Sequence, residues 1–282
     1  MEPIGSSRRT GQPLAVVVGA GGMAMAVARR LGDTYRILLA DRDGEHLDRQ
    51  VAALNTEGHD ARGVVCDVVD PAAVAALARE AADAGPVRAL AHVVGLSPSL
   101  GNGPTVLRVN LVGPTLVADA FVDVMAPGGA SVFIASLAGH LVAPTPEVMA
   151  ALDAPLSPGF VDAVAAAIDG ELSSTVAYQL SKAALIRMCQ RRAGAWGARG
   201  TRIVSLSPGL IATPQGALEF KAQPEKTRLF ELSPLPREGT MIEIADAVEF
   251  LLSDRASFIS GTDLLVDGGL AAAAREAATV SS

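Results

Sequence analysis

The sequence predicts an α/β protein: a single doubly wound domain with about seven parallel strands and helices on both faces of the sheet. Short apolar runs alternate with segments of helical composition, as parallel βαβ units require. The connections are short, and no linker divides the 282 residues into two domains. We expect the domain to cover residues 13–270, with residues 1–12 and 271–282, which lack a pattern, as loose tails.

Each apolar run reads as a buried strand, and the segment after it as a helix. Asp70 and Pro71 mark one helix start, because Asp is a favoured N-cap and Pro is tolerated in the first turn. The expected strands are 14–18, 35–40, 61–68, 88–95, 130–136, 201–209 and 263–269. Helical stretches include 23–31, 104–125 (closed by Pro127, Gly128 and Gly129), 173–197 and 241–254.

Two segments, residues 139–172 and 214–236, interrupt this alternation. Long excursions from a compact domain are often functional lids. The first is too apolar for a disordered loop, and Ser157 as N-cap with Pro158 in the first turn predicts an ordered helical flap. Its stripe of Val161, Val164 and Ile168 can face a substrate or pack on the protein body, and packing is the simpler interpretation. The second segment is expected to be a substrate loop.

Composition excludes several classes of function. The net charge of −7 comes from scattered residues, which argues against nucleic acid and anionic membranes as partners. Cys66 and Cys189 lie far apart and the four histidines are scattered, so we expect no disulfide framework and no metal site. Residues 14–28 follow Arg8 and Arg9 as in a signal peptide, but they carry a glycine pattern with its own explanation. A reducing, cytoplasmic location is expected.

The glycine pattern predicts a dinucleotide site. Gly19, Gly21 and Ala24 stand in the Gly-x-Gly-x-x-Gly/Ala spacing between the first strand and the first helix. The first Gly permits the tight turn, the second lets the backbone approach a pyrophosphate, and the small third residue allows close packing. The helix N-terminus, at Gly22 and Met23, offers free N–H groups to the phosphates. This context is that of a Rossmann domain.

Asp41 ends the second strand, about 20 residues after Gly19, where an acid can accept both ribose hydroxyls of NAD and repel a 2′-phosphate. Arg42 follows at once and could bind that phosphate. The carboxylate at the strand end favours NAD over NADP. The alternative is that Asp41 is only a turn residue.

Tyr178 and Lys182 lie four residues apart in a helical stretch, and so on one helix face. A nearby cation favours a phenolate, and a Tyr tuned in this way can exchange a proton with a carbonyl or alcohol oxygen. Taken alone, the pair could equally be a solvated Lys beside a half-buried Tyr. Ser136 ends the fifth strand, where open parallel sheets bind ligands, although Ser is also common in turns.

Together these elements resemble the short-chain dehydrogenase/reductase family over about residues 13–270. The resemblance includes Asn110, Pro208–Gly209, Thr213 and the Val-Asp-Gly-Gly run at 266–269. It implies that Tyr178 is the general acid/base and that Lys182 holds the nicotinamide ribose and lowers the Tyr pKa. Ser136 would hydrogen-bond the substrate oxygen. Asn110 would help to position a water in a proton relay to Lys182, although a buried Asn bonded to nearby backbone would fit as well.

The resemblance also implies the remaining cofactor contacts. Asp67 and the backbone of Val68 would meet the adenine, and Gly95 would pack under the cofactor. Ile211 and Thr213 would hold the carboxamide and so fix the face from which hydride leaves. The expected cofactor-binding residues are Gly19, Gly21, Gly22, Met23, Asp41, Arg42, Asp67, Val68, Gly95, Tyr178, Lys182, Pro208, Gly209, Ile211 and Thr213.

The chain departs from the family pattern in two places. Val18 replaces a common Thr and Ala24 replaces the last Gly, which leaves backbone phosphate contacts possible. The stretch His92 to Gly95 replaces an Asn-Asn-Ala-Gly motif, so its side-chain hydrogen bonds change. The insertion at 139–172 and residues 195–202 are similar to bacterial 3α-hydroxysteroid dehydrogenases/carbonyl reductases, which points to an apolar cyclic or steroid-like ketone or alcohol.

The expected function is NAD-dependent interconversion of a secondary alcohol and a ketone. One alternative is reduction of C=N or C=C bonds on the same scaffold, and another is a non-catalytic NAD-sensing or scaffold protein. The family usually forms dimers or tetramers through the two long helices that flank the sheet. The insertion could obstruct that face, so we expect a homodimer, with a homotetramer as the alternative.

Overall fold

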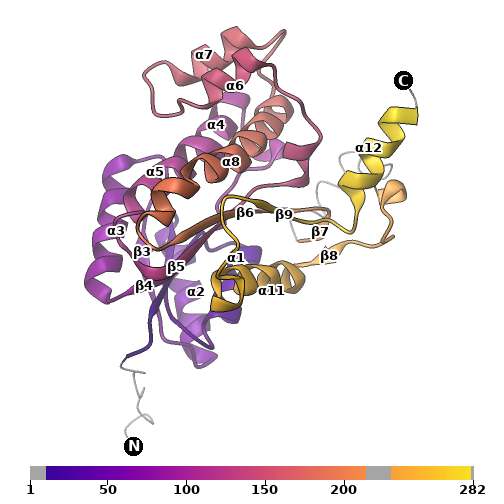
Figure 1. The fold of residues 1–282 in the computed structure, drawn as a ribbon. Helices are drawn as coiled ribbons and strands as arrows, with labels where there is room; N and C mark the ends of the chain where they lie inside the picture. Colours follow the sequence, from indigo (N-terminus) through magenta and orange to yellow (C-terminus); the bar gives the residue numbers. More distant parts are fainter. Residues whose placement is uncertain (1–10, 214–229, 281–282) are drawn as a thin grey trace, which may run out of the picture.

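Seven parallel strands form the sheet at the centre of the molecule, as the alternation of the sequence predicts (Figure 1). The computed structural model describes residues 11–213 and 230–280. The strands lie in the order β3-β2-β1-β4-β5-β6-β9. Their bounds are β1 Leu14–Val18, β2 Arg36–Asp41, β3 Ala61–Val65, β4 Val87–His92, β5 Met125–Ile134, β6 Arg202–Pro208 and β9 Asp263–Val266, and a separate parallel pair is formed by β7 Ile211–Ala212 and β8 Gly239–Thr240.

The strand order reverses between β1 and β4. Val18 pairs with Ala40 of β2 and with His92 of β4, so the carboxyl ends of all three strands are level. The residues that follow these strands therefore meet at one edge of the sheet. In doubly wound sheets, ligands bind at this reversal point, outside the carboxyl ends of the strands.

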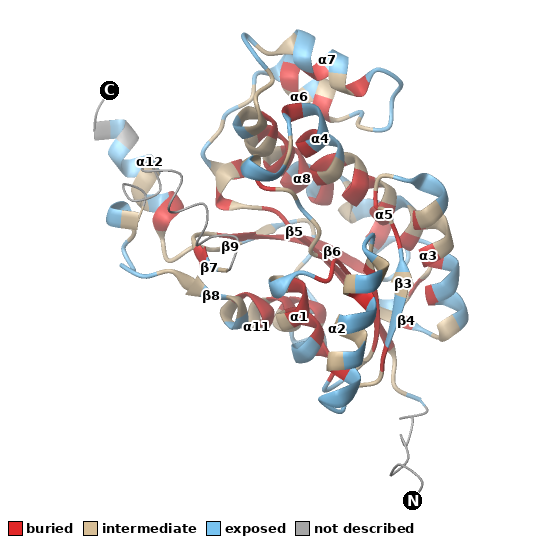
Figure 2. Ribbon diagram, turned by 180° about the vertical axis from the view of Figure 1, so that it is seen from behind, coloured by how far each residue is buried: buried red, intermediate tan, exposed pale blue. Residues whose placement is uncertain are grey.

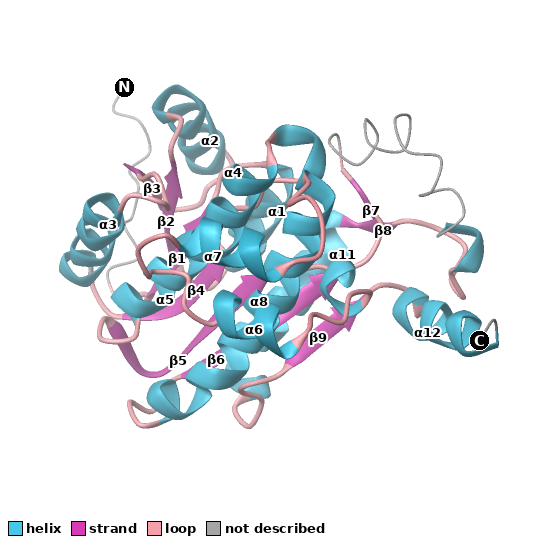
Figure 3. Ribbon diagram, turned by 90° about the horizontal axis from the view of Figure 1, so that it is seen from above, coloured by secondary structure: helices cyan, strands magenta, loops and turns pink. Residues whose placement is uncertain are grey.

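Helices cover both faces of the sheet (Figure 3). Ala15 and Val17 of β1 pack with α1, α2 and α11, and Val16 and Val18 face the layer of α3, α5 and α8. The buried residues lie along the strands and the inner sides of these helices (Figure 2). The helix bounds are α1 Gly22–Leu31, α2 Gly44–Thr56, α3 Pro71–Ala84, α4 Gly103–Leu107, α5 Gly113–Phe121, α6 Pro146–Leu152, α7 Phe160–Ala167, α8 Ser174–Gly197, α11 Met241–Leu252 and α12 Leu270–Val280, with short turns at η1 Pro98–Leu100, η2 Arg108–Val112, η3 Leu137–His140 and η4 Asp254–Ala256.

The insertion at 139–172 contains α6 and α7, which lie beyond α4 and α8 and away from the sheet (Figure 1). Phe160 and Val164 of α7 are buried in a cluster with α4, α6 and α8, so the apolar stripe packs on the protein body. The expected helix start was wrong. The N-cap of α7 is Gly159 and not Ser157. Gly159 has a left-handed backbone, with φ +72°, and so interrupts the turn that begins at Ser157.

Two other boundaries differ from expectation. The helix expected over 104–125 ends at Phe121, and β5 begins at Met125. Gly128 is therefore inside the strand, at a register shift, with φ +78°. The expected tail at 271–282 instead belongs largely to α12, because its alanine-rich stretch favours a helix and the Asp267 carboxylate accepts hydrogen bonds from Gly269 and Ala271. Residues 1–10 of the expected N-terminal tail and 214–229 of the expected substrate loop lie outside the described residues.

Candidate active site

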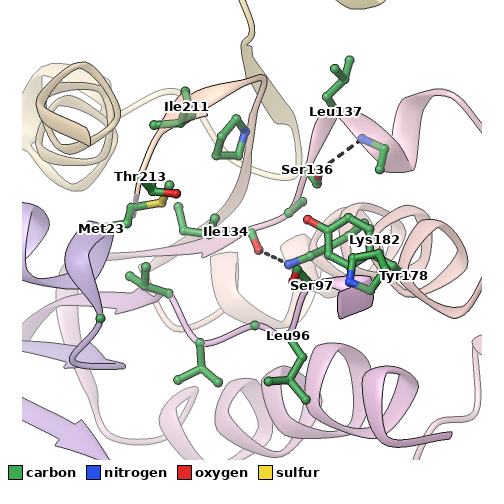
Figure 4. A pocket seen from close by; sticks show the side chains of 18 of the residues that line it. Met23, Leu96, Ser97, Ile134, Ser136, Leu137, Tyr178, Lys182, Ile211 and Thr213 are labelled. Atoms are coloured by element: carbon green, nitrogen blue, oxygen red, sulfur yellow. Dashed lines mark hydrogen bonds between the residues drawn. The ribbon is translucent and has the colours of Figure 1, made fainter. Parts of the chain in front are cut away.

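A cavity of about 640 Å³ opens at the carboxyl edge of the sheet, between the glycine loop and α8 (Figure 4). It brings together most of the expected site residues, from segments far apart in the sequence. These are Gly19, Gly21, Gly22, Met23, Asp41, Gly95, Ser136, Tyr178, Lys182, Pro208, Gly209, Ile211 and Thr213.

The glycine loop has the shape that a pyrophosphate needs. Gly19 has φ +114°, and a Cβ there would lie 3.2 Å from Val94 Cγ2. Gly21 is the N-cap of α1 and makes no side-chain cap, and a Cβ there would have no atom within 4 Å. The first turn of α1 thus keeps N–H groups for a ligand beside open space, so the loop fits a dinucleotide phosphate.

Asp41 and His46 both form hydrogen bonds with the backbone of Ala20. The Ala20 N–H donates to Asp41 Oδ2 at 2.8 Å, and His46 Nε2 lies 3.0 Å from the Ala20 carbonyl oxygen. The other Asp41 oxygen accepts from the Asp43 N–H at 3.1 Å. The carboxylate is therefore fixed in orientation at the cavity. Sequence analysis missed His46, because only the fold shows that α2 returns to the glycine loop.

Tyr178 and Lys182 lie one turn apart on α8, with Lys182 Nζ 5.7 Å from the centre of the phenol ring (Figure 4). Lys182 is only 3% exposed, and its Nζ donates to the Ile134 carbonyl at 2.9 Å. Burial lowers the pKa of Lys182 to about 8. Because this pKa is still above neutrality, the ammonium is mostly charged at pH 7, in surroundings where screening by water is weak.

Ser136 is the N-cap of η3, and its Oγ accepts a hydrogen bond from the Ala138 N–H at 3.2 Å (Figure 4). Ser136 therefore lies in the cavity wall two residues after the end of β5, and it also begins a turn. A Cβ on Gly139 would lie 2.7 Å from the Lys182 carbonyl carbon, so η3 packs directly on α8. As an acceptor in the turn, the Ser136 hydroxyl still has its proton to donate to a substrate oxygen.

Asn110 lies in η2, a π-helical turn between α4 and α5, and is 1% exposed. Its Oδ1 accepts from the Leu96 N–H at 2.8 Å, and its Nδ2 donates to the Leu96 carbonyl at 2.9 Å. The side chain therefore fixes the segment after β4. A Cβ on Gly95 would lie 3.3 Å from Lys182 Nζ and 3.4 Å from Asn110 Oδ1, so Gly95 packs closely against both side chains.

Three expected cofactor residues, like Asn110, are not in the cavity wall. Arg42 is exposed, and the Asp67 Oδ1 accepts from the Val69 N–H at 3.1 Å. Val68 is buried against Gly113. Arg42, Asp67 and Val68 therefore do not line this cavity with the other expected residues.

Several lining residues were not identified from the sequence. Thr175 and Gln179 lie on α8 within one turn of Tyr178, and the helical period was the signal that could have found them. The others come from loops that only the fold brings to the cavity. They include Val93, Val94, Leu96, Ser97, Pro98, Leu137, Ala138 and Leu141.

Over 11–213 and 230–280, no three His, Cys, Asp or Glu side chains gather so that they could hold a metal ion. Within the same ranges, no helix combines the length and apolar character needed to cross a membrane.

Comparison with known proteins identifies the family. A family model described as enoyl-(acyl carrier protein) reductase matches residues 18–168 and 160–271. The short-chain dehydrogenase/reductase bsc3 of Alternaria brassicicola is 33% identical over 92% of this chain and 95% of its own length. The 3-alpha-hydroxysteroid dehydrogenase/carbonyl reductase of Comamonas testosteroni is 35% identical over 64% of this chain and 71% of its own.

The fold agrees with this assignment. The structure of a short-chain type dehydrogenase/reductase from Mycobacterium ulcerans matches with a TM-score of 0.75 and 23% identity, over 92% of this chain and 90% of that one. The chain therefore belongs to the short-chain dehydrogenase/reductase family, oxidoreductases that depend on a nicotinamide dinucleotide.

Proposed function

We propose that the protein is an NAD-dependent oxidoreductase that interconverts a secondary alcohol and a ketone. The observation that carries the proposal is the position of Ser136, Tyr178 and Lys182 on one cavity with the glycine loop and Asp41. Ser136 would provide an electrostatic contact to the substrate, Tyr178 a proton donor and Lys182 a buried charge.

In the direction of ketone reduction, the Ser136 hydroxyl donates a hydrogen bond to the carbonyl oxygen and steadies the charge that develops there. Tyr178 gives its phenolic proton to the same oxygen. The nicotinamide of a bound cofactor would supply the hydride to the carbon, so that C=O becomes CH–OH. The Lys182 ammonium stabilises the phenolate that remains.

The same residues would hold the cofactor. Lys182 would bind the nicotinamide ribose, and Ile211 and Thr213 would bind the carboxamide. Asp41 supports NAD over NADP, because its fixed carboxylate would accept ribose hydroxyls and repel a 2′-phosphate. Arg42 is exposed and does not line the cavity, so it would contribute little to binding a 2′-phosphate.

Leu96, Leu137 and Leu141 in the cavity wall support an apolar cyclic or steroid-like substrate. The Comamonas relative, whose name describes action on a hydroxysteroid and carbonyl compounds, supports this class.

We propose a homodimer in the cytoplasm. Arg187 and Arg191 of α8 form ion pairs with Asp153 of the insertion, so part of the α8 surface is already covered within one chain. The buried, free thiols of Cys66 and Cys189 fit a reducing compartment. Light scattering tests the subunit number, and a monomer would contradict the dimer.

A panel of alcohols and ketones, assayed with NAD(H) and NADP(H) in parallel, tests the function. We expect turnover of cyclic secondary alcohols with NAD and of the matching ketones with NADH. An inactive ketone panel beside an active imine or enone would favour C=N or C=C reduction. Tight NAD binding without turnover of any of these compounds would instead indicate an NAD-sensing or scaffold protein.

A further inference from the structure

A polar stripe on α8 lines the cavity over two helical turns. Thr175, Tyr178, Gln179 and Lys182 follow one another at the spacing of a single helix face, and all four contribute to the cavity wall. The proposed chemistry uses Tyr178 and Lys182. Thr175 and Gln179 have no part in it.

The stripe runs from the floor of the cavity to its mouth. Lys182 is 3% exposed, Tyr178 and Gln179 are half-buried, and Thr175 is exposed. Thr175 lies one turn from Tyr178 toward the mouth, and Gln179 follows Tyr178 directly, so a ligand that reaches the Tyr178 hydroxyl lies close to both side chains. These two side chains lie beside the part of the substrate that does not react.

Neither side chain is used to hold the protein together. Within the described part of the chain, the Gln179 amide and the Thr175 hydroxyl make no hydrogen bond. The Gln amide carries two donor hydrogens and an acceptor oxygen, and leaving such groups unpaired when a ligand displaces water is unfavourable. A ligand that pairs with them is preferred over one that does not.

Charge restricts the ligand further. Among the described lining residues, only Asp41 and Lys182 carry a formal charge. The first belongs to the dinucleotide end of the cavity, and the second is buried with its ammonium bonded to Ile134. The rest of the described lining near α8, which includes Leu96, Ser97 and Ser136, is neutral, so an anionic group on the substrate would meet no further cation among these residues.

We propose that Gln179, assisted by Thr175, selects substrates with a second, uncharged oxygen that these two side chains can reach when the reacting carbon lies at the Tyr178 hydroxyl. The substrate class is then neutral alicyclic hydroxyketones and diols. This rests on the proposed alcohol–ketone function and adds to it a residue that determines specificity.

Four ketones of one ring size separate the possibilities: cyclohexanone, 4-methylcyclohexanone, 4-hydroxycyclohexanone and 4-oxocyclohexanecarboxylate. With NADH, we expect kcat/KM for the hydroxyketone to exceed that for the methylketone by about fivefold, the range of one neutral hydrogen bond. The carboxylate should be the poorest substrate.

Gln179→Leu keeps the approximate size of the side chain and removes its polar groups. We expect the hydroxyketone-to-methylketone ratio of kcat/KM to fall to about one in this variant, and Thr175→Val to lower the ratio by a smaller factor. Gln190→Leu is the matched control, because Gln190 is exposed on the same helix and does not line the cavity. This control should keep the wild-type ratio.

The outcomes separate a failure of this inference from a failure of the proposed alcohol–ketone function. Turnover of the ketones with a wild-type ratio near one, or a ratio that Gln179→Leu leaves unchanged, would overturn the role of Gln179 while the alcohol–ketone function stands. Preference for the carboxylate would overturn the neutral substrate class. If none of the four ketones is reduced with either cofactor, the proposed function fails, and the inference fails with it.

Discussion

Acid should destabilise this protein through His92, at the end of β4. The ring is fully buried, stacks on Phe133 with a centroid distance of 5.5 Å, and has no hydrogen-bond partner for either nitrogen among the described residues. Burial, with a smaller contribution from the charge of Lys182, lowers the pKa of His92 to about 3. The ring therefore stays neutral in the folded protein across the physiological range.

The sign of the effect follows from the two pKa values. In the unfolded chain the pKa returns to about 6.5, so between pH 6.5 and pH 3 the unfolded state binds a proton that the folded state does not. Stability contributed by this group is complete above pH 6.5 and is lost as the pH falls. Between pH 7.5 and pH 5.0 the loss is about 2 kcal/mol, and it is insensitive to the folded pKa as long as that value lies well below 5.

Urea unfolding of the wild type and His92→Leu at pH 7.5 and 5.0 measures this loss. Leu replaces two unpaired buried nitrogens with apolar atoms, so we expect the two proteins to differ by about 1 kcal/mol or less at pH 7.5. From pH 7.5 to 5.0 the wild type should lose about 2 kcal/mol more than the variant. An equal loss in both proteins would refute the assignment of a neutral, buried His92.

Three further predictions concern the cofactor loop and the insertion. Asp41→Asn keeps an acceptor for the Ala20 N–H but removes the charge, so the NADH-to-NADPH ratio of dissociation constants should shift about tenfold toward NADPH; an unchanged ratio would contradict the role of the carboxylate. His46→Leu should weaken NADH binding about fivefold in calorimetry, and His46→Gln, which can still donate a hydrogen bond to the loop, should bind NADH almost as tightly as the wild type. Equal binding by both variants would contradict a role of the His46–Ala20 hydrogen bond in shaping the loop. Phe160→Ala should lower the unfolding free energy by about 3 kcal/mol, against less than about 0.5 kcal/mol for the half-exposed Leu156→Ala control, and similar losses would argue against a packed insertion.

Features with a short-range signal could be predicted from the sequence. The apolar runs of the seven strands and the spacing of Gly19 and Gly21 are local patterns, and each has one dominant structural explanation. Tyr178 and Lys182 share a face of α8 for the same reason, since four residues span about one helical turn. Sheet order then brings these local features to one edge.

Features that depend on contacts between distant segments could not be predicted. The end of α5 is set by the pairing of β4 with β5, through Val87 and Met125, and not by the Pro-Gly-Gly run. The hydrogen bond between His46 and the Ala20 carbonyl forms only because α2 returns to the glycine loop. The helix at the C-terminus was missed because Asp267 was read as part of a family motif and not as the residue that caps α12.

Tyr178→Phe tests the central claim most directly, because it removes one hydroxyl and keeps the ring beside Lys182. The measurement is kcat with NADH on a ketone that the wild type reduces, together with the NADH dissociation constant of both proteins. We predict that kcat falls by at least about 100-fold while the dissociation constant changes by less than about threefold, since proton transfer is lost and the dinucleotide pocket is retained. A kcat within threefold of the wild type would contradict the role of Tyr178 as the general acid/base.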